Sequence, residues 1–429
     1  MFRASLISAV TAILVMAVNF LVSVVTARSL GPEGRGAFYS VQVFALFVAS
    51  AAQLGLGQAM VYAVRAKIIQ FGAAYDRSSA LTTILSVCLA AATFQVFLSE
   101  GDVSKWTALC YAAAVSITIF CGFCAQLDSS LKTYNFARIG LPVLVLLGLC
   151  AASLAETLSL RVAIDIQAAA TLVIACGTWL YLRRKFRSKS SDPSLHQGPS
   201  NANRQSLMGL GLKFHVTTMT GIIATNADKI YLMARASTAD LGIYSIAFST
   251  SRILSSLYES IATSLYSRYG GQRETGSTDV VLQVFRITFV PMLIAAIAAG
   301  LAGHIFIPII FGQRFVGATL PFSILLIEAT LSGSSWMLAQ KFNIDGKPGL
   351  VAVRQVASVI PMLAALPLLP QKNLIIWLSL VMTLSGAIRL FLTALFMIKM
   401  EKILLRQLVP TISDAHFVLG MFDRKGSSE

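Results

Sequence analysis

Residues 6–27 read LISAVTAILVMAVNFLVSVVTA, an uninterrupted run without a charged side chain. An α-helix needs about 20 apolar residues to cross the hydrocarbon core of a membrane, so this run predicts a transmembrane helix. Arg3 precedes it, as a basic residue precedes the core of a signal peptide. The run is longer than the roughly 7–15 residues of such a core, and further apolar runs follow. We therefore expect residues 6–27 to be a retained helix.

The same pattern recurs along the chain. Of its 429 residues 56% are hydrophobic and 12% are charged, whereas ordinary soluble domains carry about 25% charged residues. This composition excludes a soluble enzyme and predicts an all-α integral membrane protein. Twelve stretches are long and apolar enough to be transmembrane helices: 6–27, 37–64, 80–98, 106–127, 139–155, 162–182, 207–232, 242–266, 280–302, 316–339, 350–369 and 374–398.

The basic residues orient these helices. With the N-terminus in the cytoplasm, 22 of the 34 Lys and Arg residues fall in cytoplasmic segments and eight in outer loops. Because cytoplasmic loops are enriched in Lys and Arg, this asymmetry predicts that both termini are cytoplasmic. It also explains the net charge of +15 without a nucleic-acid partner. The predicted organisation is an N-lobe (1–182), a basic cytoplasmic linker beside the membrane lipids (183–205), a C-lobe (206–398) and a basic cytoplasmic tail (399–429).

The two lobes begin alike. Asn19 stands nine residues before Arg28, and Asn226 stands nine residues before Arg235. A short polar segment then leads to Gly-Ala-Phe at 36–38 in the first lobe and to Gly-Ile-Tyr at 242–244 in the second. Lobes with even numbers of spans are related by an axis along the membrane normal. The repeat predicts two pseudo-symmetric six-helix lobes with a binding site between them.

Four segments of the chain carry a recognisable pattern: ARSLGPEGRGAFY at 27–39, NADKIYLMARASTADLGIYSIAFS at 226–249, LPFSILLIEA at 320–329 and LAQKFNIDGKPG at 338–349. These segments resemble the Wzx-type polysaccharide flippases of the multidrug/oligosaccharidyl-lipid/polysaccharide exporter superfamily. The resemblance implies a carrier that moves an undecaprenyl-diphosphate-linked oligosaccharide across the bacterial inner membrane. It places the protein in the biosynthesis of a surface polysaccharide (exopolysaccharide, capsule or the O-antigen of lipopolysaccharide), with polysaccharide polymerase machinery as a further partner.

Charged residues within the spans are the candidate functional residues. An ionised side chain at the bilayer centre costs roughly 2.5–3.5 kcal/mol, so such residues face protein or water. By helical rise, Arg252 and Glu328 lie near the midplane. The spans of the first lobe carry amides such as Asn19 but no deeply placed charge. Those of the second lobe carry Lys213, Asp228, Arg252, Glu259, Arg286, Glu328 and Arg389.

A diphosphate requires fixed positive charge, and the planar fork of arginine pairs bidentately with phosphate oxygens. We therefore predict that Arg252, Arg286 and Arg389 bind the substrate, with Lys213, Asn19 and Asn226 as further substrate-binding residues. The alternative for the arginines is structural neutralisation by acids. Three acids each have two alternative roles. Glu259 and Glu328 either carry protons or hold arginines in place. Asp228 either receives a coupling cation or pairs with Arg235.

Other chemistry has little support in the sequence. The four histidines are far apart, the six cysteines lie in apolar runs, and no GxxxxGK[ST] loop is present, so no metal, cofactor or nucleotide hydrolysis is expected. Glycines at 53–58 and 209–213 are expected to allow close helix approach. The alternatives are a cation-coupled multidrug exporter, which would carry an acid deep in the first lobe, and a polysaccharide polymerase or ligase, which would carry a long periplasmic loop.

Overall fold

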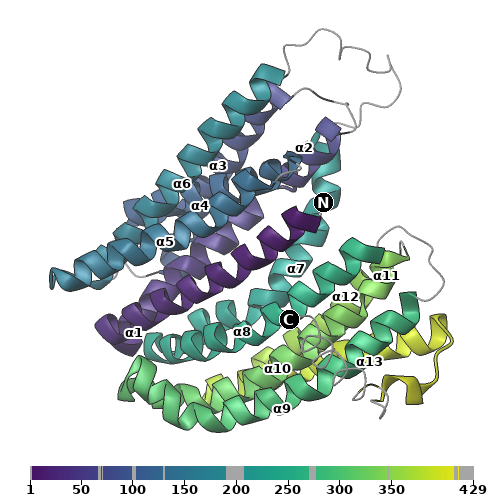
Figure 1. Ribbon diagram of the computed structural model, residues 1–429. Coiled ribbons are helices and arrows are strands. Elements are labelled where there is room, and N and C mark those ends of the chain that lie inside the picture. Colours follow the sequence, from purple (N-terminus) through teal and green to yellow (C-terminus); the bar gives the residue numbers. More distant parts are fainter. Residues whose placement is uncertain are drawn as a thin grey trace, which may run out of the picture. The chain divides into compact units, whose positions relative to one another are not determined.

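The computed structural model is helical, and no strand occurs in the residues that it describes (Figure 1). These are residues 2–65, 69, 71–98, 103–128, 131–189, 207–269, 277–345, 347–409 and 414. The predicted all-α class is thus confirmed. The helices are α1 (Phe2–Ala52), α2 (Leu56–Arg65), α3 (Phe71–Phe97), α4 (Lys105–Cys124), α5 (Lys132–Leu154), α6 (Leu160–Lys189), α7 (Leu207–Arg235), α8 (Thr238–Tyr269), α9 (Ser277–Phe311), α10 (Thr319–Leu338), α11 (Gln340–Ile344), α12 (Pro348–Ala365) and α13 (Leu374–Met400).

Nine helical stretches of the described residues are long and apolar enough to cross a membrane. Each contains at least one of the predicted spans or most of one, and the stretch in α1 contains most of the first and of the second. α7 and α8, which carry Asp228, Lys229 and Arg252, are outside this set. The chain is therefore a multi-pass membrane protein, and twelve spans in two lobes stays a prediction.

The first unit comprises residues 1–245. In it, α4 packs against α6, α3 and α1, and α1 also contacts α5 (Figure 1). A core of small and aromatic side chains, including Phe38, Phe94 and Ala112, fills the space between these helices. A second core around Tyr75 and Phe120 includes the buried Cys121, which behaves as a small hydrophobic residue beside the Tyr75 hydroxyl.

Two breaks shape the start of this unit. Gly31 has φ 68° and ψ −175°, and it joins two helical halves of α1 with Pro32 directly after it. A β-carbon makes this backbone conformation unfavourable, so glycine fits here. Leu54 and Gly55 also have positive φ and separate α1 from α2, so the predicted span 37–64 is not one continuous helix. Gly55 lies where α2 meets α7, because a Cβ there would be 2.1 Å from the carbonyl oxygen of Gly211. This confirms the close approach expected of the two glycine-containing segments.

The second unit comprises residues 246–429. α10 is central among its described helices, with α13 and α9 against it, and α12 packs against α13 (Figure 1). Tyr258, Phe285, Met337 and Phe342 belong to its buried core. The predicted linker and tail are only partly described. α6 continues into the linker as far as Lys189, residues 190–206 are outside the described part, and beyond α13 the described residues are 401–409 and 414.

Candidate functional site

A buried ion pair joins α8 to α10 in the second unit. Arg252 on α8 donates from Nη2 to Oε2 of Glu328 on α10. Glu328 is 3% exposed, and Ser332 Oγ donates to its other carboxylate oxygen at 2.6 Å. The Arg252 side chain is 30% exposed, and its guanidinium carbon lies 4.4 Å from the centre of the Phe248 ring. This is the contact expected of a carboxylate that holds an arginine in place.

Arg389 on α13 lies beside this pair. Its Nε donates to Ser358 Oγ on α12 at 3.3 Å, and its guanidinium interacts electrostatically with both Glu328 and Arg252. Gly386 of α13 lies directly against α10 here, because a Cβ at that position would lie 2.9 Å from the Oγ of Ser332, the residue that donates to Glu328. The structure thus brings Arg252, Glu328 and Arg389, three of the predicted site residues, into one cluster.

Arg354 joins the same region. The count of basic residues assigns it to a cytoplasmic loop at 340–355, which overlaps the start of the predicted span 350–369. The structure places Arg354 within α12, where it is fully buried, so its assignment to the loop is wrong and its place in the span is confirmed. Its Nη1 donates to Ser335 Oγ on α10 and to Thr393 Oγ1 on α13, the latter at 3.2 Å. The signal that was missed is local. Pro348 starts a helix well, so Arg354 already lies in the second turn of an apolar helix.

The cluster has the chemistry of an anion site. Side chains of α8, α10, α12 and α13 bring three arginines and one carboxylate together here. Guanidinium groups pair bidentately with phosphate oxygens, and the low dielectric of a protein interior strengthens such contacts. In this cluster Arg252 has a buried carboxylate partner and a side chain that is 30% exposed, although its Nε is buried. Arg354, by contrast, is fully buried.

Arg286 is placed elsewhere in the second unit. On α9, its Nε and Nη2 donate to the two carboxylate oxygens of Asp414 at 2.8 and 3.0 Å. Its Nη1 donates to the carbonyl oxygen of Gln407 at 2.8 Å. All three nitrogens of its guanidinium are thus engaged by the segment that follows α13. Arg286 holds that segment in this structure, and it is not part of the cluster formed by Arg252 and Arg389.

The structure tests the roles of two further predicted residues, Glu259 and Lys213, only in part. Glu259 is exposed on α8, seven residues after Arg252. Lys213 belongs to α7, but its side chain is outside the described part of the chain. Their predicted roles, substrate binding for Lys213 and proton transfer or ion pairing for Glu259, stay predictions.

Asp228 forms a buried network in the first unit. Tyr244 donates its hydroxyl to Asp228 Oδ2 at 2.6 Å, and Lys229 Nζ lies 3.2 Å from Oδ1. The same Nζ donates to the carbonyl oxygen of Thr225 at 2.6 Å. The predicted partner, Arg235, is exposed at the end of α7, so the expectation of an Asp228–Arg235 pair is wrong. Lys229, which lies near the end of the predicted span 207–232, is buried one position from Asp228 and supplies the neutralising charge.

The two asparagines of the repeat have different surroundings. Asn226 donates from Nδ2 to the carbonyl oxygen of Ile222 and to Thr225 Oγ1, both at 3.0 Å. Its amide is thus bound by its own helix. Asn19 is exposed on α1, and its carbonyl oxygen accepts a hydrogen bond from Ser23. Neither residue is near Arg252 in sequence or within the same unit, and their predicted contacts with substrate stay predictions.

The glycines of the internal repeat form a helix crossing. A Cβ on Gly36 of α1 would lie 1.8 Å from the carbonyl oxygen of Thr238, and a Cβ on Gly242 of α8 would lie 2.0 Å from that of Pro32. Pro32 and Thr238 each stand four residues before the glycine of their own segment. The contact is therefore reciprocal. Small residues allow this backbone approach, so the repeated glycine has a packing role in both segments.

Arg35 connects the helices at this crossing through hydrogen bonds. The sequence predicts it in an outer loop at 28–36, but it is 3% exposed within α1, a few residues after the break at Gly31. Its guanidinium donates to Thr26 and Ser23 on the preceding half of α1 at 3.0 and 3.3 Å and to Ser245 on α8 at 3.2 Å. A single arginine thus ties both halves of the kinked helix to the start of α8.

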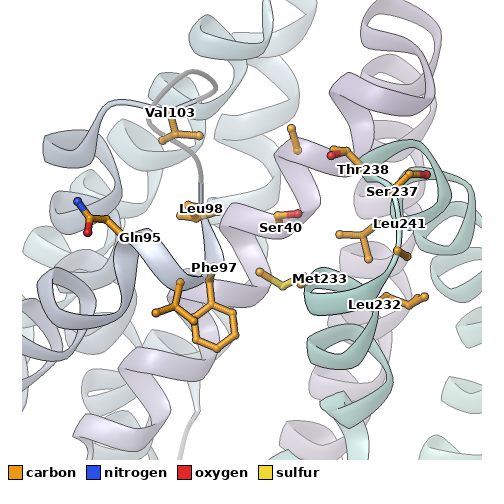
Figure 2. Close-up of a pocket in the computed structure, with 13 residues that line it drawn as sticks. Ser40, Gln95, Phe97, Leu98, Val103, Leu232, Met233, Ser237, Thr238 and Leu241 are labelled. Carbon is orange, nitrogen blue, oxygen red and sulfur yellow. The ribbon is translucent and has the colours of Figure 1, made fainter. Parts of the chain in front are cut away.

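A pocket of about 330 Å³ lies beside the crossing in the first unit (Figure 2). Figure 2 shows Ser40 of α1 and Leu241 of α8 among the side chains around it, together with Phe97 at the end of α3 and Met233 near the end of α7. None of the predicted site residues lines this pocket. Most of its lining side chains are apolar, with a few hydroxyl and amide groups among them.

The helical fold and the arginine cluster define a multi-pass membrane protein with a cationic interior. The family model described as "Polysaccharide biosynthesis protein" matches residues 2–266, which is more than half of the chain. The chain belongs to this family. No curated protein matches the sequence significantly.

Solved structures of flippases and multidrug transporters share the fold. The lipid II flippase MurJ in an inward closed conformation matches with a TM-score of 0.70 and 11% identity, over 95% of this chain and 89% of MurJ. An inward-facing MATE multidrug resistance transporter of the MOP superfamily matches with a TM-score of 0.56 and 13% identity, over 90% of this chain and 95% of the transporter. The MATE multidrug transporter DinF-BH, solved in a complex, matches with a TM-score of 0.59 and 15% identity, over 93% of this chain and 95% of DinF-BH. At these identities the likeness concerns the fold alone.

Proposed function

We propose that the protein is a flippase that moves an undecaprenyl-diphosphate-linked oligosaccharide across the bacterial inner membrane for surface polysaccharide biosynthesis. Membership of the polysaccharide biosynthesis protein family and a fold similar to MurJ support a lipid-linked saccharide as substrate. The observation that carries the proposal is the cluster of Arg252, Arg389 and Glu328 on α8, α13 and α10. It supplies fixed cations for a diphosphate inside an apolar helical unit.

In this proposal, each predicted residue has a distinct task. Arg252 binds the diphosphate first, because its side chain is only partly buried. Arg389 binds it from the neighbouring helix, and Glu328 holds Arg252 in position until the anion arrives. Arg286 changes partner from Asp414 to the substrate, and Lys213, Asn19 and Asn226 contact the saccharide or the headgroup. Both termini are cytoplasmic, loading takes place from the cytoplasm, and polymerase machinery receives the translocated unit.

The alternative within the same fold is a cation-coupled multidrug exporter. Two acids on the first six helices already have basic partners: Asp76 pairs with Arg183 at 2.9 Å and Asp128 with Lys185 at 2.5 Å. Both pairs tie the cytoplasmic ends of neighbouring helices in the proposed orientation. They have the character of structural ion pairs, which favours the lipid-linked substrate over an exported drug.

Deletion of the gene in its native host tests the proposal. We expect undecaprenyl-diphosphate-linked oligosaccharide to accumulate on the cytoplasmic face of the inner membrane and surface polysaccharide to be lost, both restored by the wild-type gene. Extraction of lipid-linked oligosaccharides followed by mass spectrometry measures the first effect. Susceptibility to cationic drugs should not change. If no intermediate builds up and the surface polysaccharide is normal, the flippase proposal is wrong; a change in drug susceptibility alone would identify an exporter.

A further inference from the structure

Arg354 and Arg389 form a reciprocal contact between α12 and α13. Arg354 Nη1 on α12 donates to Thr393 Oγ1 on α13 at 3.2 Å, and Arg389 Nε on α13 donates to Ser358 Oγ on α12 at 3.3 Å. On each helix the arginine and the hydroxyl residue are four positions apart, so they share one face. The two guanidinium groups are therefore held close together on facing helices, and their charges repel each other.

Ion pairs do not balance the charge of these two arginines. Neither Arg354 nor Arg389 forms an ion pair with a carboxylate of the residues described above. Arg354 is fully buried, and within the described part of the chain its Nε and Nη2 have no hydrogen-bond acceptor. Glu328, which interacts electrostatically with Arg389, is already bound to Arg252. The cluster therefore holds more positive than negative charge.

Such an arrangement is costly for the folded protein. Removing a cation from water without a compensating anion is unfavourable, and a hydrophobic residue of similar volume at position 354 would avoid this cost. Hydrogen bonds to Ser335 and Thr393 satisfy only one of the three guanidinium nitrogens. Packing alone thus gives no reason for an arginine here, whereas a bound anion does.

We propose that Arg354 is a positioning residue for the diphosphate site. Its charge repels the guanidinium of Arg389 towards Glu328 and Arg252, and it adds to the field that attracts a polyvalent anion to those two arginines. Arg354 itself is fully buried and acts through Arg389 and through its charge. This inference rests on the proposed function, since the anion is taken to be the diphosphate of the lipid-linked substrate.

The valence of the anion separates a field effect from a packing effect. A charge one helix away acts over distance in a medium of low dielectric constant. Its effect on binding grows with the charge of the anion, so pyrophosphate responds more strongly than phosphate. A purely structural role for Arg354 would weaken both anions equally. Thr393→Val provides a matched control, because it removes the same interhelical hydrogen bond but keeps the charge of Arg354.

The experiment measures binding of inorganic pyrophosphate and inorganic phosphate to the purified full chain in detergent by titration calorimetry. For Arg354→Gln we expect pyrophosphate binding about tenfold weaker than wild type, with a smaller loss for phosphate. Arg354→Lys should recover most of the lost pyrophosphate affinity, and Thr393→Val should stay within about twofold of wild type. If Arg354→Gln does not accumulate in cells, Glu328→Gln is compared with the double variant Glu328→Gln/Arg354→Gln. Pyrophosphate is then expected to bind the double variant about tenfold more weakly than it binds Glu328→Gln.

Each outcome bears on one of the two proposals. If the wild type binds pyrophosphate, Arg389→Gln weakens it and Arg354→Gln does not, the positioning role is wrong and the proposed function stands. If Thr393→Val and Arg354→Lys weaken both anions as much as Arg354→Gln does, the role is packing and the inference is also overturned. If the wild type binds neither pyrophosphate nor an undecaprenyl-diphosphate lipid, the proposed function itself fails.

Discussion

At the scale of single residues, the ion pair between Arg252 and Glu328 leads to the strongest prediction. Arg252→Ala should abolish export of the polysaccharide, and Arg252→Lys should retain part of it, because lysine keeps the charge but loses the bidentate fork. Arg389→Ala should likewise abolish export, and Arg389→Lys should retain part of it. Surface polysaccharide in a complemented deletion strain measures export. Protein levels must be compared, since removing one member of a buried ion pair costs ~3–5 kcal/mol and can deplete the protein.

Arg286 offers a comparison within the same unit. Its nitrogens are bound by Asp414 and by Gln407. Arg286→Ala is expected to impair export less than Arg252→Ala, because in this structure its guanidinium is committed to the tail segment. If alanine at 252, 286 and 389 leaves export normal in well-expressed variants, the cationic-cluster mechanism is wrong.

Substitution of Glu328, unlike that of the arginines, is expected to strengthen anion binding. Glu328→Gln keeps the volume of the side chain and a hydrogen bond with Ser332, but it removes the negative charge that occupies Arg252. We expect pyrophosphate to bind the variant about tenfold more tightly than wild type, since the anion no longer competes with a carboxylate. Titration calorimetry on purified protein measures the change. Weaker binding would mean that Glu328 serves mainly to orient Arg252.

At the scale of helices, the glycine crossing of the first unit is the most sensitive contact. A Cβ on Gly36 would meet a backbone carbonyl oxygen at 1.8 Å and one on Gly242 at 2.0 Å, and a backbone atom cannot move aside as a side chain does. Gly36→Ala and Gly242→Ala are therefore expected to lower stability by at least about 1–3 kcal/mol. The midpoint of thermal unfolding in detergent, followed by fluorescence-detected gel filtration, measures this loss.

Gly177 is the matched control for that crossing. It also lies within a helix, α6, but no atom lies within 4 Å of the position that a Cβ would take there. Gly177→Ala should leave stability unchanged or raise it by about 0.5–1 kcal/mol, because alanine favours the helical state. Equal losses at all three glycines would show that the crossing has no special importance.

The helices themselves were largely predictable from sequence, and the breaks and buried charges between them were not. Long apolar runs predict helices because a membrane allows few other structures. Close helix approach at the glycines of 53–58 and 209–213 was predictable from their spacing, but the contact of Gly55 with Gly211 was not. The burial of Arg35, Lys229 and Arg354 was not, since each stands at the edge of an apolar run, where a loop and a helix end have the same composition. Which acid an arginine meets depends on helix packing, so the Arg252–Glu328 pair stayed one of several alternatives.

At the scale of the whole molecule, the distribution of basic residues predicts the orientation in the membrane. The 22-to-eight bias of Lys and Arg places the segment between α6 and α7 and the C-terminal tail in the cytoplasm, and the turn between α7 and α8 on the outer side. Single cysteines at Leu195 and Lys425 should therefore react only with membrane-permeant thiol reagents in intact cells. A cysteine at Ser237, which is exposed in that turn, should react with an impermeant reagent as well.

The labelling requires a background without native cysteines, because Cys88, Cys110 and Cys176 are exposed on their helices and would react themselves. Their replacement by alanine is expected to leave the protein folded, since none has a disulfide partner.

The orientation also fixes the direction of transport. The anion site must be loaded from the side on which the lipid-linked substrate is made, and this is the cytoplasm in the proposed function. Reaction of Leu195→Cys or Lys425→Cys with the impermeant reagent would reverse the orientation, and with it the direction of loading.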